Sequence, residues 1–226
     1  IYKVDWDAFI EVFRLGWPIG LTHLAETFLF ASAGFFMGLV STEALAAHGI
    51  AMEVVALTFM LHLGLSKAAT VRVSYALGVR DGSSLIGAII GASVLSLSVV
   101  FCTVIVFLTI PDVIVSLFLN PEDPQRGNII AIGVSLLTVG AIYQLTDAGQ
   151  VMILSILRGL QDTKVPMFVA AFGYLIIGAP MCYFVGIYLG YGAPGVWMGL
   201  VAGLGVVCFL LGLRLLFILK NLKMTL

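Results

Sequence analysis

Charged residues are scarce in this sequence. Asp, Glu, Lys and Arg make up 10% of its 226 residues, whereas hydrophobic residues make up 61%. Soluble domains are only about 45–50% apolar and about 25% charged. The net charge is −1, and the sequence contains neither a basic stretch nor a stacking-aromatic module, so nucleic acid is not expected as a partner. The composition predicts an integral membrane protein.

Cysteine is also sparse. Cys102, Cys182 and Cys208 all lie in apolar segments without metal-site spacing, so neither a disulfide framework nor a metal centre is expected. The sequence also lacks Gly-x-Gly-Asp, Gly-x-Ser-x-Gly and His-Glu-x-x-His motifs, and it has no Gly-x-x-x-x-Gly-Lys phosphate loop. These absences argue against an intramembrane hydrolase and an ATP-driven pump. No enzymatic activity and no cofactor are expected.

Long apolar runs dominate what remains. A run of about 20 apolar residues predicts a helix that spans the bilayer. The sequence contains six such runs, at residues 14–40, 43–66, 84–110, 128–157, 165–190 and 194–219. The connections between them are short and contain no Pro-, Ser- or charge-rich linker. We therefore expect an all-α membrane protein in which residues 1–226 form a single six-helix unit surrounded by lipid.

Positive charge is distributed unevenly between the loops. Ten of the eleven Lys and Arg residues fall at one end of the predicted spans, and only Arg126 falls at the other. Because cytoplasmic loops carry the excess of Lys and Arg, both termini are expected in the cytoplasm. The loops near residues 41–42, 120–128 and 191–192 are then expected outside.

Two acids lie deep within these apolar runs. Glu26 is twelve residues from Arg14, and Asp147 is eleven residues from Arg158. At a rise of about 1.5 Å per residue, both carboxylates lie roughly 16–18 Å from the cytoplasmic face. Acids at this depth usually face a bundle interior or a water-filled path and mark an ion or substrate site. The alternative is that each acid is protonated and contributes only to helix packing.

The helix neighbours of both acids are polar, since residues three and four apart share a face. Thr22 and His23 accompany Glu26, and a second set accompanies Asp147, namely Tyr143, Gln144 and Gln150. Carboxylate, hydroxyl and amide oxygens suit either a proton or a hard monovalent cation. One acid–histidine pair, Glu26 with His23, has too few ligands for a transition-metal site.

Other polar and small residues have weaker functional implications. Glu53 also lies near the midplane but has apolar neighbours, so a functional and a structural role are equally open. His48 and His62 are each expected to donate a hydrogen bond to a neighbouring helix, and Arg158 is expected to order a cytoplasmic turn with Asp162. Close helix packing is indicated by four Gly-x-x-x-Gly spacings, at 16–20, 87–91, 186–190 and 199–203.

Several short strings, in this order and spacing, resemble the multidrug and toxic compound extrusion (MATE) transporters. They are PIG at 18–20 followed by Glu26, LAAH at 45–48, LTFM at 57–60, AATVRV at 68–73 with ALG at 76–78, and LRGLQDT at 157–163. The resemblance covers nearly the whole chain and is to the C-terminal six-helix half of a NorM-type bacterial member.

The resemblance implies a fold of two six-helix lobes facing each other across a central cleft. This chain would supply one lobe, with the N-terminal lobe expected upstream of Ile1. It further implies an inner-membrane antiporter that exports cationic or amphipathic drugs in exchange for sodium ions or protons. In the NorM-type branch, an acid on the first helix of this lobe and one on the fourth form the cation site, and these positions match Glu26 and Asp147.

The sequence departs from the family pattern at a few positions. Gly49, His62 and Lys67 replace residues that are often Gln, Pro and a neutral residue, respectively, and Glu53 adds an acid near the expected cleft. Two other functional hypotheses remain open besides the antiporter. One is a six-helix homodimeric channel or a lipid-precursor flippase, and the other is an intramembrane hydrolase.

Overall fold

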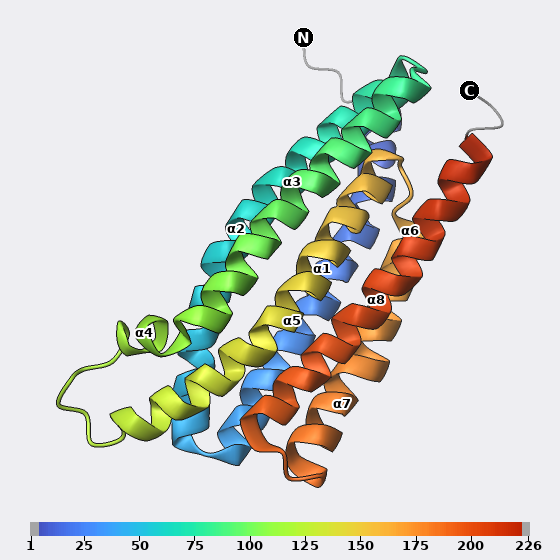
Figure 1. The fold of residues 1–226 in the computed structure, drawn as a ribbon. Helices are drawn as coiled ribbons and strands as arrows, with labels where there is room; N and C mark the ends of the chain where they lie inside the picture. The colour runs from blue at the N-terminus through green and yellow to red at the C-terminus, as the bar shows by residue number, and fades with distance from the viewer. Residues whose placement is uncertain (1–4, 223–226) are drawn as a thin grey trace.

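The computed structural model describes residues 5–222 as a bundle of long helices that run side by side (Figure 1). The long helices are α1 (Trp6–Val40), α2 (Thr42–Gly78), α3 (Gly82–Thr109), α5 (Arg126–Gly159) and α8 (Gly192–Leu222). Between α5 and α8 lies a composite helix of four consecutive parts: α6 (Lys164–Ala171), η1 (Phe172–Gly178), α7 (Ala179–Tyr183) and η2 (Phe184–Tyr188). The start of α1 and the end of α8 lie at the same end of the bundle.

Six helices are long and apolar enough to cross a membrane, which confirms the predicted all-α, six-span fold class. Two of the helices, α1 and α2, extend well beyond the spans predicted for them. The first begins at Trp6 instead of residue 14, and the second continues to Gly78 instead of ending at residue 66. Lys and Arg mark where a span leaves the bilayer, but as good helix formers they do not end the helix. The short α4 (Pro111–Ser116) was not predicted.

Short polar side chains set the helix boundaries. Asp5 accepts a hydrogen bond from the backbone of Ala8 at 3.1 Å and caps α1. The Ser41 hydroxyl accepts from the Ala44 N–H at 3.0 Å, so a single residue separates α1 from α2. Asp81 accepts from the N–H groups of Ser83 and Ser84 and caps α3. These caps satisfy N–H groups that the first turn of a helix leaves free.

Helix α5 is the most enclosed of the six spans, because 44% of the residues in its apolar stretch are buried. It packs against α2, α3 and α8, and α1 packs against α2, α8 and the composite helix. Polar hydrogen bonds join α2 and α5 near one end of the bundle. Thr70 donates to the Ser155 carbonyl at 2.9 Å, and Ser74 donates to the Gly159 carbonyl at 3.1 Å. The central position of α5 places Asp147 inside the bundle.

Glycines allow the composite helix to approach α8 closely. A Cβ at Gly199 would overlap the Cys182 backbone, and one at Gly203 would lie 2.7 Å from the Gly178 Cα. The close packing predicted from the spacing at 199–203 is thus confirmed. At 186–190 only Gly186 meets a neighbour, since a Cβ there would overlap Val196 of α8. The expectation is wrong for Gly16, Gly20, Gly87 and Gly91, which face open space within the described chain. A spacing alone does not tell which face of a helix meets a neighbour.

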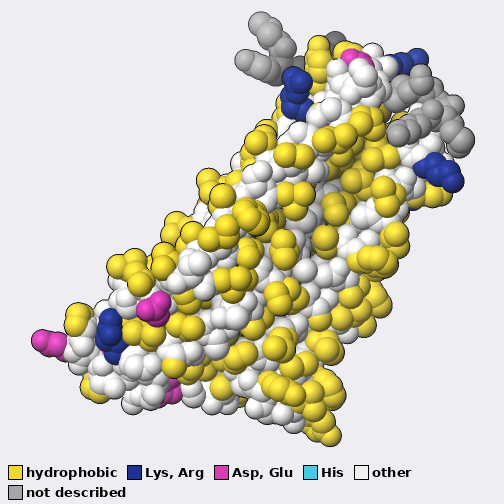
Figure 2. Space-filling view, in the orientation of Figure 1, with side chains coloured by type: hydrophobic (Ala, Val, Ile, Leu, Met, Phe, Trp, Pro, Cys, Tyr) yellow, Lys and Arg dark blue, Asp and Glu magenta, His cyan; other side chains and the backbone are white. Residues whose placement is uncertain are grey.

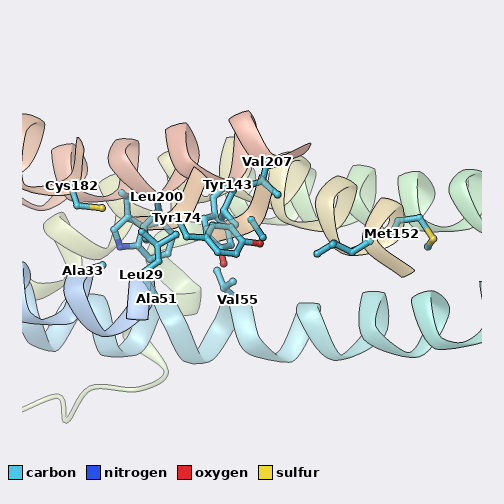
Figure 3. Packing of buried hydrophobic residues seen from close by; sticks show 14 of the residues in the cluster. Leu29, Ala33, Ala51, Val55, Tyr143, Met152, Tyr174, Cys182, Leu200 and Val207 are labelled. Carbon is cyan, nitrogen blue, oxygen red and sulfur yellow. The ribbon is translucent and has the colours of Figure 1, made fainter. Parts of the chain in front are cut away.

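The surface has the pattern expected for a membrane protein. On the face shown in Figure 2, Lys, Arg, Asp and Glu side chains gather toward the two ends, and hydrophobic side chains cover the middle. Within the bundle, buried apolar residues form one cluster that includes Leu29, Val55, Leu200 and Val207 (Figure 3). Tyr143 and Tyr174 lie among these side chains, so their hydroxyl groups need partners inside the bundle.

Candidate functional site

Gln150 on α5 links the two midplane carboxylates. Its Nε2 donates to Glu26 Oε1 at 3.0 Å and lies 3.5 Å from Asp147 Oδ1. Asp147 and Gln150 are three residues apart on α5, whereas Glu26 comes from α1. The sequence predicted that both acids lie at one depth. The structure brings them to the same amide group.

Tyr174 completes the buried network from the fifth span. Its hydroxyl donates to Gln150 Oε1, so both ends of the Gln150 amide are occupied. Asp147 is 1% exposed, and Gln150 and Tyr174 are fully buried. Glu26 is more accessible, with a side-chain exposure of 13%, and its Oε2 lies 3.3 Å from His23 Nδ1. The network therefore has a closed end at Tyr174 and an accessible end at Glu26.

A pocket of about 310 Å³ opens onto the accessible end of this network. Glu26, Asp147 and Tyr143 line it together with His23 and Thr27, and the remaining lining residues are apolar, namely Phe30, Met52, Val55, Ala56, Phe59 and Leu63. Small-molecule sites are often apolar cavities of about 300–1,000 Å³ with a few polar groups. Two carboxylates in an apolar pocket can hold a proton or a small cation or can attract a larger organic cation.

Of the five predicted supporting residues, only Tyr143 lines this pocket; Gln150 lies behind it in the carboxylate network, and the other three belong to neither. Thr22 is buried, but its hydroxyl donates to the Pro18 carbonyl of its own helix at 2.9 Å. Gln144 is also buried and donates through Nε2 to the Thr58 hydroxyl on α2, away from the two acids. Glu53 is exposed on α2 and does not line the pocket. Thr22 and Gln144 were predicted from a helix face shared with an acid and Glu53 from its depth, but neither criterion specifies the partner of a side chain.

Tyr174 is the functional candidate that the sequence analysis missed. It is ten residues after Lys164, and a rise of about 1.5 Å per residue places it about 15 Å deep. This is nearly the depth of both acids. A buried tyrosine hydroxyl usually has a hydrogen-bond partner, so a tyrosine at that depth was a detectable signal.

The two buried histidines, His48 and His62, both contact side chains of neighbouring helices, but His48 does not act as the predicted hydrogen-bond donor. His48 Nδ1 accepts a hydrogen bond from Trp197 Nε1 at 3.0 Å, so the prediction that His48 would donate is wrong for this contact. The Trp197 ring also packs against Tyr143, with 5.6 Å between ring centroids. His62 Nδ1 lies 3.1 Å from the Ser96 hydroxyl on α3.

Arg158 and Asp162 do not form the predicted pair. Asp162 accepts from Arg214 Nε on α8 at 2.8 Å instead. Residues 5–222 contain no group of three or more His, Cys, Asp and Glu side chains that could hold a metal ion.

Known proteins share this fold, and one family model matches the sequence. A family model described as MatE matches residues 18–184 of the chain. The chain belongs to the MatE family. This MatE chain is 40% identical over 220 residues to the probable multidrug resistance protein NorM of Agrobacterium fabrum, a match that covers 97% of the chain and 47% of that protein. It is also 38% identical to the multidrug resistance protein NorM of Burkholderia vietnamiensis, a match that covers 90% of this chain and 44% of that protein.

Solved structures of MATE proteins share the fold. A MATE structure in the bent conformation matches with a TM-score of 0.84 and 19% identity, covering 99% of this chain and 48% of the other. An inward-facing multidrug resistance MATE transporter matches with a TM-score of 0.82 and 19% identity, covering 99% and 51%. The MatE chain therefore has the fold of one lobe and spans about half the length of these relatives. It is a multi-pass membrane protein with a transporter fold.

Proposed function

We propose that this chain is the C-terminal lobe of a secondary antiporter that exports cationic or amphipathic drugs across the bacterial inner membrane. Sodium ions or protons drive the export. The proposal rests chiefly on the two carboxylates of Glu26 and Asp147, which share the Gln150 amide beside an apolar pocket. The names of the NorM relatives support multidrug export.

The two acids have different parts in the proposed mechanism. Glu26 is reachable from the pocket, so it meets the incoming cation or the drug first. Asp147 is buried, and a cation or proton that neutralises it removes the cost of an isolated charge inside the bundle. Binding of the coupling ion weakens the attraction of a cationic drug to the same carboxylates. Drug and ion therefore compete, and each must lower the affinity of the other by the same factor.

Gln150 and Tyr174 position the pair. Because Tyr174 donates to Gln150 Oε1, the amide is oriented with its Nε2 toward Glu26 and Asp147. Tyr143 lies against the pocket and supplies an aromatic ring for a cationic drug. The partner lobe encloses the drug from the opposite side, and rocking of the two lobes about this midplane site alternates access.

The test is dye efflux by the full-length transporter in vesicles, driven separately by a sodium gradient and a proton gradient. One gradient should drive efflux of a fluorescent cationic dye, and Glu26→Gln and Asp147→Asn should each abolish it. Glu53→Gln is the matched control, because this acid lies on α2 outside the pocket and the change should leave efflux nearly unaltered. Efflux that persists in both site variants would mean that the carboxylates are structural.

A further inference from the structure

A second cavity lies at the end of the bundle where positive charge is concentrated. It has a volume of about 320 Å³ and lies between α1 and the turn that connects α5 to α6. The lining residues are Glu11, Arg14, Leu15, Gln161, Asp162, Thr163 and Lys164. None of them lines the pocket at Glu26. The cavity is thus separate from the proposed transport site.

Three of the four charged residues that line this cavity have no ion-pair partner in the described chain. Arg14 and Lys164 form no ion pair within residues 5–222, and neither does Glu11. Asp162 differs, because Arg214 donates to it at 2.8 Å and neutralises it. Two free cations and one free carboxylate therefore share one cavity.

A buried residue whose hydroxyl has no protein partner also lines the cavity. Thr163 is only 6% exposed, and its side chain makes no hydrogen bond in the described chain, although it occupies the N-cap position of α6. The hydroxyl is therefore free to donate to a ligand in the cavity. The first turn of α6 contributes the N–H groups of Lys164 and Val165, which have no backbone acceptor. Donors of this kind at a helix N-terminus suit a phosphate group.

An apolar surface continues from the cavity along α6 to the first residue of η1. Val165, Phe168 and Phe172 are 38%, 66% and 48% exposed, and Phe168 and Phe172 follow Lys164 at helical spacings of four and eight residues. Residues at such spacings share one helix face. A ligand with its phosphate in the cavity can therefore lay an acyl chain along α6, which a free phosphate ion cannot do.

We infer that this cavity binds the headgroup of an aminophospholipid of the phosphatidylethanolamine type. Its phosphodiester accepts hydrogen bonds from Arg14, Lys164 and Thr163, and its ammonium group donates to Glu11. A headgroup with both charges matches the two kinds of unpaired group in the cavity. Phosphatidylglycerol would leave Glu11 without a cation, and the quaternary ammonium of phosphatidylcholine has no N–H to donate.

The experiment is a titration of the purified, delipidated full-length transporter with short-chain phospholipids, followed by native mass spectrometry. Dioctanoyl phosphatidylethanolamine should bind at least about tenfold more tightly than the phosphatidylcholine analogue, a difference that corresponds to about 1.4 kcal/mol. Arg14→Ala and Lys164→Ala should each weaken binding about tenfold. Glu11→Gln should remove the preference for phosphatidylethanolamine over phosphatidylglycerol.

Two controls separate this site from general membrane electrostatics and from misfolding. Lys67→Ala removes an exposed cation on α2 outside the cavity and should leave lipid binding unchanged. Thr163→Val keeps the shape of the side chain and removes the hydroxyl, so it should weaken binding while the unfolding temperature stays close to that of the wild type.

Three results would overturn the proposal. The first is an equal loss of binding in Lys67→Ala, which would indicate nonspecific attraction. The second is competition by inorganic phosphate at the same concentration as the lipid, which would identify a free-anion site. The third is an absence of lipid binding by the wild-type transporter, as expected if another segment of the protein fills the cavity.

Discussion

At the residue scale, Gln150 is the side chain on which the arrangement of the two acids depends. Its amide donates a hydrogen bond to Glu26, lies farther from Asp147, and accepts a hydrogen bond from the Tyr174 hydroxyl. Removing either carboxylate changes the charge of the site. Removing the tyrosine hydroxyl changes only the orientation of the amide, so it separates geometry from charge.

We therefore expect Tyr174→Phe to weaken ion coupling without abolishing drug binding. The substitution leaves Gln150 Oε1 buried without its donor, and an unsatisfied buried polar group costs about 1–3 kcal/mol. Gln150 is then free to rotate, which lowers the affinity for the coupling ion severalfold. Measurements are the ion dependence of dye efflux and the thermal unfolding of the transporter.

Tyr183→Phe is the control for this prediction. Tyr183 lies in the same span, is 49% exposed, and makes a ring contact with Phe36 but no hydrogen bond in the described chain. Removing its hydroxyl should leave both coupling and stability unchanged. Equal effects in the two variants would show that the loss does not arise at the carboxylate network.

Part of this network could be predicted from the sequence. The depths of Glu26 and Asp147 follow from counting residues to Arg14 and Arg158, and the helical period placed Gln150 next to Asp147. The partner of each polar side chain could not be predicted in this way. The hydroxyl of Thr22 bonds to its own backbone, and the amide of Gln144 bonds to α2, because both choices depend on how the helices pack.

At the element scale, the contact between the composite helix and α8 depends on the absence of side chains. The Gly199 Cα faces the backbone of Cys182, which has no rotamer to change. Gly199→Ala should therefore separate the two helices and destabilise the lobe by about 1–3 kcal/mol, as expected for overpacking. The measurement is the midpoint of unfolding by heat or denaturant.

Gly64→Ala provides a matched comparison for this substitution. Gly64 lies inside α2, and a Cβ there would meet nothing within 4 Å. Since alanine favours a helix by about 1 kcal/mol over glycine, this change should be neutral or stabilising. Destabilisation of the same size in both variants would contradict the proposed role of the close helix contact.

The Asp81 cap in the turn between α2 and α3 should stay ionised to low pH. Hydrogen bonds from Ser84, followed by those from Ser83, lower the pKa of Asp81 from 3.8 to about 2. Because the folded pKa is depressed, the cap stabilises the helix start at pH values above 3.8 and is lost as the pH falls toward 2. An NMR titration of the carboxyl group should show this low pKa, and Ser84→Ala should raise it. A pKa that stays low without Ser84 would contradict this assignment.

Helix ends were harder to predict from the sequence than helix cores. Each apolar run overlaps one of the six membrane-length helices, but α1 and α2 continue past Arg14 and Lys67, since a charged residue is compatible with a helix outside the bilayer. The π-helical stretches η1 and η2 also lay beyond sequence reasoning. They flank Pro180, which lacks the N–H needed for the regular helical hydrogen bond.

At the scale of the whole molecule, charge sets the expected direction in the membrane. Arg14 and Arg158 lie near one end of the bundle, as does Arg80 in the turn between α2 and α3, and Arg126 begins α5 at the other end. The positive-inside rule predicts that the first end faces the cytoplasm. The pocket at Glu26 and the proposed lipid cavity near Arg14 then lie at the midplane and at the cytoplasmic face, respectively.

Orientation can be measured by labelling single cysteines in intact cells, after Cys102, Cys182 and Cys208 have been replaced by serine. A membrane-impermeant maleimide should label Glu122→Cys, which is exposed in the loop before α5. It should not label Ser83→Cys, which is exposed at the start of α3, until the cells are permeabilised. The reverse pattern would place the positive charges outside. It would invert the proposed direction of ion entry, and it would move the aminophospholipid cavity to the outer leaflet.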